Sequence, residues 1–124
     1  MNPPDYTDGL DELIYAHRRY VGLSQTDMAR ALGMNLHSYK RIEDGRRPCP
    51  PGLLDTVVAL SDDFDALVHA QIERWEADGV PETVEVRSTD TPLERAVANR
   101  AAVEYGTITP IRVGGETPAA RKAG

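Results

Sequence analysis

Apolar residues recur at three- and four-residue spacing along much of this chain, which is the period of an amphipathic helix. The first such run extends from about Asp8 to Val21 and ends at Gly22. Two shorter runs lie on either side of Gly33. A much longer run begins after the prolines at 50 and 51 and continues to Asp78. It predicts one long helix, or two helices separated near residues 61–63, with Pro51 well placed to open it.

The period changes after residue 79. Residues 80–88 alternate between apolar and polar, which predicts a short strand. One strand is not stable alone, so it must pair with residues 107–113 or with a strand of a second subunit. Between these segments, Thr91-Pro92-Leu93-Glu94 has the sequence of a capping box and predicts a helix that reaches Tyr105.

The two short runs around Gly33 predict a helix-turn-helix. Ser24 is a good N-cap for the first helix and Asn35 for the second. Gly33 can adopt the left-handed conformation that ends a helix. In the second helix, Tyr39 and Ile42 are spaced to face inward, which leaves the other side chains free. A second helix that exposes polar groups at its N-terminal end is typical of a DNA-recognition helix.

These residues carry a family resemblance. The pattern S-Q-x-x-x-A-x-x-L-G, followed by Y-x-R-I-E-x-G-R-R, resembles the Cro/C1-type (XRE) family of phage and bacterial repressors. The resemblance covers residues 8–60 and implies a lambda-repressor-like helix-turn-helix domain within a mostly α fold. It also implies which residues meet DNA.

The positions that reach base edges in such proteins are occupied here by Leu36, His37 and Arg41. Arg41 is the strongest candidate, because a guanidinium can bond O6 and N7 of guanine together. Leu36 departs from the polar residue usual at its position and can offer only an apolar contact. The phosphate contacts that we expect come from Gln25, Asn35, Ser38, Lys40, Arg46 and Arg47.

The net charge of −6 is unusual for a DNA-binding protein, but it is unevenly distributed. Residues 1–50 carry seven Lys and Arg against seven Asp and Glu, whereas residues 51–124 carry seven against thirteen. Phosphate binding depends on the local field, so the acidic half is expected to face away from DNA.

The single cysteine, Cys49, excludes an internal disulfide and fits a reducing cytoplasm. No apolar run approaches a membrane span, and the acidic start lacks the basic region of a secretory leader.

Residues 61–113 are interpreted as a dimerisation region, with residues 114–124 as a disordered tail. The long helix extends apolar side chains beyond what a small DNA-binding domain needs, and such a surface favours a partner. Packing within the same chain is the equal alternative. The residues assigned to the subunit interface are Phe64, Val68, Ile72, Trp75, Val84, Val86, Val97 and Tyr105. The layout of residues 64–106 also resembles anti-CRISPR-associated phage repressors, which implies dimerisation through this region and autorepression.

We therefore expect a homodimeric, sequence-specific repressor that binds double-stranded DNA at an inverted-repeat operator. The alternative is an antitoxin-type protein-interaction module whose helix-turn-helix regulates its own operon. An enzyme is not expected, because His17, His37 and His69 lie on separate helical runs and no catalytic pattern emerges. The sequence suggests no metal, cofactor, small-molecule ligand or membrane association.

Overall fold

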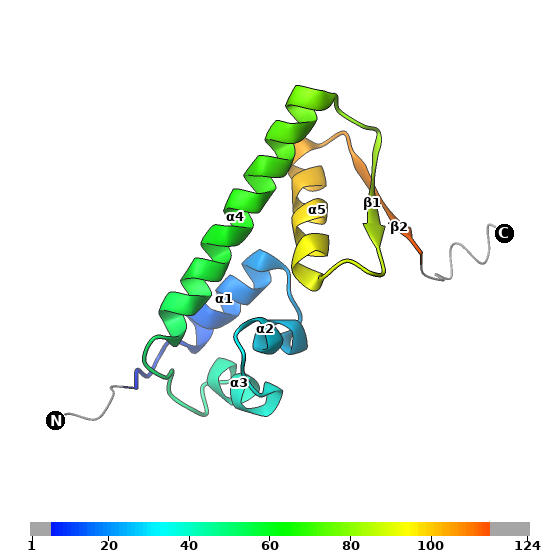
Figure 1. Cartoon of the computed structure of the whole chain (residues 1–124). Coiled ribbons are helices and arrows are strands. Elements are labelled where there is room, and N and C mark those ends of the chain that lie inside the picture. The colour runs from blue at the N-terminus through cyan, green and yellow to red at the C-terminus, as the bar shows by residue number, and fades with distance from the viewer. Residues whose placement is uncertain (1–5, 115–124) are drawn as a thin grey trace. The chain divides into compact units, whose positions relative to one another are not determined.

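In the computed structural model, the described residues 6–114 form five helices and one two-stranded sheet (Figure 1). The chain divides after Asp65 into two compact units, which we call unit 1 and unit 2. Within residues 6–114, no helix is both long and apolar enough to cross a membrane. The tail predicted to be disordered lies, apart from Gly114, outside the described residues.

Unit 1 contains three short helices and the first part of a long one. These are α1 (Asp11–Val21), α2 (Gln25–Ala31), α3 (Leu36–Glu43) and the start of α4 (Leu53–Asp78). Helix α1 begins three residues later than predicted, and the amide of Ile14 donates to the carbonyl of Leu10 at 2.9 Å to start it. The core of the unit is a set of almost fully buried side chains: Ile14, Val21, Met28, Tyr39, Ile42, Val57 and Phe64.

Polar side chains between α1 and α4 complete this core. His17 Nδ1 and Ser61 Oγ share a hydrogen bond of 2.7 Å, and Ser61 is buried. Tyr20 donates its hydroxyl proton to Asp65, and its ring meets that of Phe64 edge-on with centroids 5.9 Å apart. These contacts hold the first part of α4 against α1, and they place Phe64 inside unit 1.

Helix α4 runs without a break through residues 61–63, which decides between the two predicted alternatives in favour of one long helix. It begins at Leu53 and not at Pro51. Pro51 and Gly52 form a turn, in which the amide of Leu53 donates to the carbonyl of Pro50 at 3.2 Å. The prolines at 48, 50 and 51 therefore all lie in the irregular segment between α3 and α4, before the first residue of the helix.

Unit 2 contains the rest of α4, followed by a strand–helix–strand arrangement. Strand β1 (Thr83–Arg87) is followed by α5 (Pro92–Tyr105) and β2 (Thr109–Val113). The two strands are parallel and in register from Thr83 opposite Thr109 to Arg87 opposite Val113. The strand therefore pairs within its own chain, which decides between the two pairings that the sequence left open. Thr91 caps α5 as predicted, because its Oγ1 accepts from the Glu94 amide at 3.1 Å while Glu94 accepts from the Thr91 amide.

Burial within one chain corrects the argument for an exposed apolar surface on α4. Four of the residues assigned to the subunit interface are buried in the single chain, namely Phe64, Val68, Trp75 and Val86. The other four are half-buried: Ile72, Val84, Val97 and Tyr105. The rings of Trp75 and Tyr105 meet edge-on, with centroids 6.3 Å apart, inside unit 2. The alternative interpretation, packing within the same chain, therefore accounts for the four buried residues.

Candidate nucleic-acid interface

The turn between α2 and α3 is tight because Gly33 adopts a φ of +67°, which favours glycine. The amide of Met34 then donates to the carbonyl of Ala29 at 2.8 Å, and the amide of Gly33 donates to the carbonyl of Arg30 at 3.1 Å. These bonds satisfy carbonyls at the end of α2 that would otherwise lack a partner. The turn fixes the angle at which α3 leaves α2.

Side-chain caps start both helices at the predicted residues. Ser24 Oγ accepts from the amide of Asp27 at 3.1 Å at the start of α2. Asn35 Oδ1 accepts from the amides of His37 and Ser38, at 2.9 and 3.4 Å, at the start of α3. Asn35 is therefore occupied as a cap through its oxygen, and only its amide nitrogen remains for a phosphate.

Helix α3 has one buried face and one open face. Tyr39 and Ile42 are at most 1% exposed and anchor the helix in the core of unit 1. His37, Lys40 and Arg41 are exposed on the opposite face, with Lys40 and Arg41 about one turn after His37. Leu36 and Ser38 at the start of the helix are half-buried. The residues expected to reach base edges thus lie on or beside the open face.

A buried ion pair ties the end of α3 to α1. The guanidinium of Arg18 donates from Nε and Nη2 to both carboxylate oxygens of Glu43, at 2.7 to 3.1 Å. Its Nη1 donates to the carbonyl of Leu23 at 3.1 Å. The Arg18 and Glu43 side chains are 13% and 4% exposed. Arg18 is therefore a structural residue, with its guanidinium bonded within unit 1.

Gln25 completes this cluster from α2. Its amide donates to Glu43 Oε1 at 3.3 Å, so it braces α3 against α2. One N–H of this amide is engaged with Glu43, and the second remains for the phosphate contact predicted for Gln25. Local sequence does not identify this role of Glu43, because its partners Arg18 and Gln25 come from other helices.

The pKa values of the cluster reflect its burial and its charges. Burial alone would raise the pKa of Glu43, but the hydrogen bonds and positive charge of Arg18 lower it below the ordinary 4.5. Glu43 raises the pKa of Arg18 in turn. Burial, and then the nearby Glu43 carboxylate, raise the pKa of Tyr39. The Tyr39 hydroxyl has no hydrogen-bond partner of good geometry among the described residues, so we attribute the effect of Glu43 mainly to its charge.

The segment after α3 carries two more arginines. Gly45 adopts a φ of +77° and packs against Asp11, whose Oδ2 would lie 3.2 Å from any added Cβ. The amides of Arg46 and Arg47 then both donate to the carbonyl of Arg41, at 2.9 and 3.1 Å. Within residues 6–114, Lys40, Arg41, Arg46 and Arg47 form no ion pair. Their charges are available to an external anion.

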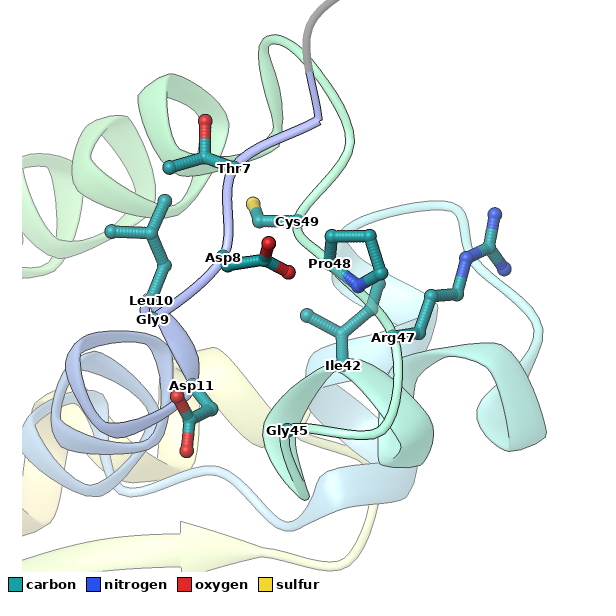
Figure 2. A pocket seen from close by; sticks show the side chains of 10 residues that line it. All are labelled: Thr7, Asp8, Gly9, Leu10, Asp11, Ile42, Gly45, Arg47, Pro48 and Cys49. Carbon is teal, nitrogen blue, oxygen red and sulfur yellow. The ribbon is translucent and has the colours of Figure 1, made fainter.

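A small polar cavity of about 100 Å³ lies beside this segment (Figure 2). Asp8 and Asp11 line it from the N-terminal side, and Pro48 and Cys49 from the segment after α3. Arg47 also borders the cavity, but its side chain extends away from the N-terminal residues. Burial raises the pKa of the Cys49 thiol, and the residue is 3% exposed. In the described part of the chain, no group of three or more His, Cys, Asp or Glu could hold a metal ion.

Comparison with known proteins supports the helix-turn-helix interpretation. Residues 13–62 match a protein family described as a helix-turn-helix domain, which covers most of unit 1. No curated protein matches the chain. The predicted helix-turn-helix domain is therefore confirmed for this part of the chain, and it is a domain type that binds DNA.

Replacing Glu43 by Gln tests whether the buried pair holds α3. At pH 7 we expect Glu43→Gln to lower the free energy of unfolding by about 1.5–3 kcal/mol, because the partly buried Arg18 guanidinium loses its charged acceptor. The pKa of Glu43 is lowered in the folded state, so its stabilisation is present above pH 4.5 and is lost as the pH falls through the folded-state pKa. Urea unfolding of wild type and variant from pH 7 to pH 3 should show the difference shrinking below pH 4.5. A difference independent of pH would contradict this role for the carboxylate.

Proposed function

We propose that this protein is a sequence-specific DNA-binding transcription regulator that inserts α3 into the major groove. The observation that carries the proposal is the division of α3 into two faces. Tyr39 and Ile42 anchor one face in the core, while His37, Lys40 and Arg41 remain exposed on the other. A helix held in this way presents side chains to base edges at the start of its exposed face.

Arg41 is the principal base-reading residue in this proposal. Its guanidinium is exposed, forms no ion pair within residues 6–114, and can bond O6 and N7 of one guanine. His37 is also exposed and can donate or accept a hydrogen bond. Leu36 supplies an apolar contact, for instance with a thymine methyl group. Sequence preference would therefore rest on few direct contacts.

Phosphate binding falls to the residues around the open face. Arg46 and Arg47 lie in the loop that follows α3, and Lys40 lies on the exposed side of the helix. Ser38 and the amide nitrogen of Asn35 lie at the start of the helix, where backbone amides and the helix dipole favour an anion. Gln25 acts through Glu43 in this scheme, as a brace for the recognition helix.

We further propose a homodimer that represses its own operon from an inverted-repeat operator. Two recognition helices about 34 Å apart would read half-sites one DNA turn apart. The repressor that we propose is of the Cro/C1 type, because the motif of unit 1 resembles that family. More narrowly, it is of the anti-CRISPR-associated phage type, whose layout unit 2 resembles. It would act by binding, without catalysis, in the cytoplasm of a bacterial host. An antitoxin tail that folds only on its partner is less consistent with the capped helix and paired strands of unit 2.

The exposed surface that best suits a subunit contact is a groove between α4 and α5 in unit 2. It has a volume of about 230 Å³ and is lined by Leu67, Gln71, Arg74, Leu93, Glu94, Val97 and Ala98. Leu67 is 47% exposed there, which is high for a large apolar side chain. Arg74 and Glu94 carry opposite charges. In a dimer with two-fold symmetry, Arg74 of one groove would face Glu94 of the other.

Two arginine variants separate base reading from phosphate binding. With DNA from upstream of the protein's own gene, Arg41→Ala should cost about 1–3 kcal/mol of binding and relax the preference at one base pair. Arg46→Ala should weaken binding to that DNA and to scrambled DNA alike, because a phosphate contact carries no sequence information. Fluorescence anisotropy on both DNAs measures these differences. Equal losses on the two DNAs for Arg41→Ala would refute its role in base reading.

Substitution in the groove tests the homodimer. Sedimentation equilibrium of the full chain should give a dimer, and Leu67→Asp should make it monomeric by burying an unpaired charge at the contact. Val103→Asp is the matched control, because Val103 is 74% exposed on α5 and does not line the groove. A wild-type monomer would refute the homodimer. A Leu67→Asp dimer as stable as the wild type would place the contact elsewhere.

A further inference from the structure

The N-terminal segment is bonded to the loop that follows α3. The amide of Thr7 donates to the carbonyl of Cys49 at 3.0 Å, and the amide of Cys49 donates to the carbonyl of Thr7 at 2.9 Å. The two residues form an isolated antiparallel bridge. No side-chain pattern indicates this bridge, because only backbone groups form it.

This bridge is the second attachment of a short loop. The loop, residues 45–50, leaves α3 where the amides of Arg46 and Arg47 donate to the carbonyl of Arg41. Its far end is held by Thr7 and by the buried side chain of Cys49. Figure 2 shows the N-terminal segment running beside Cys49, while the Arg47 side chain extends away from both. The loop is thus fixed at both ends. The charged side chains of Arg46 and Arg47 take no part in either attachment.

We propose that Thr7 is a positioning residue for DNA binding, and that its backbone bridge to Cys49 fixes the loop that presents Arg46 and Arg47 to phosphates. The inference rests on the proposed DNA binding. A loop held in one conformation before binding loses less conformational freedom when DNA is bound, so its contacts contribute more to affinity. Thr7 itself touches no DNA in this scheme. It acts through the position of the two arginines.

The single cysteine of the chain makes the bridge measurable. Cys49 is 3% exposed, so its thiol reacts with a reagent only when the loop opens. The test variant is Thr7→Pro, because proline has no amide proton to donate to Cys49. The matched control is Thr7→Ala, which changes the side chain and keeps both backbone bonds. A chain lacking residues 1–7 is a second way to remove the bridge if Thr7→Pro folds poorly, and circular dichroism checks the fold of each protein.

Each protein is measured for the rate of thiol modification by an aromatic disulfide reagent and for DNA affinity at several salt concentrations. Thr7→Pro should raise the rate by roughly tenfold or more, since opening of the loop limits it. It should weaken binding to operator and scrambled DNA by the same factor, and lower the slope of log affinity against log salt by about 1–2, as lost phosphate contacts do. Thr7→Ala should match the wild type in every readout.

Three results would overturn the inference. A rate unchanged in both Thr7→Pro and the truncated chain would mean that the bridge does not hold the loop. A faster rate with unchanged affinity and salt slope would mean that the loop position does not matter for DNA. A loss confined to operator DNA, at an unchanged slope, would assign Thr7 to base reading. A wild-type protein without DNA affinity would instead refute the proposed function, while the thiol rates would still test the bridge.

Discussion

The guanidinium of Arg18 and the carboxylate of Glu43 join the first helix to the end of the third, and the arrangement of unit 1 depends on this pair. Both side chains are largely buried, and each charge would be costly without the other. Gln25 adds a bond from α2 to the same carboxylate. Three helices therefore converge on Glu43. The buried pair fixes α3 from behind, so its opposite face needs no partner within residues 6–114 and remains open.

The sequence predicted local structure well and non-local contacts poorly. Ser24, Asn35 and Thr91 cap their helices as expected, because an N-cap bonds amides two or three residues away. Arg18 and Glu43 are 25 residues apart, and nothing in their spacing identifies them as partners. The bridge between Thr7 and Cys49 uses backbone atoms alone, so no side-chain pattern could reveal it. The base and phosphate roles of the candidate residues remain predictions.

The long helix illustrates a second limit of sequence reasoning. Its periodic apolar residues predict that one face is buried, but periodicity does not identify the part of the structure that packs against this face. Phe64 packs on Tyr20 in unit 1, and Trp75 meets Tyr105 in unit 2, so one chain covers both. What remains for a second subunit is the less conspicuous exposed groove around Leu67. The excess acid lies in residues 51–124, so Lys40, Arg41, Arg46 and Arg47, which form no ion pair within residues 6–114, set the local field around α3.

Selection from a pool of random DNA duplexes tests the central claim most directly, because it presupposes no operator. The wild-type protein is bound to the pool, and the retained DNA is amplified and sequenced over several rounds. The account predicts enrichment of an inverted repeat whose half-sites lie about one helical turn apart, with a guanine at the position that Arg41 reads. Retention of DNA with no enriched sequence, or no retention at all, would contradict it.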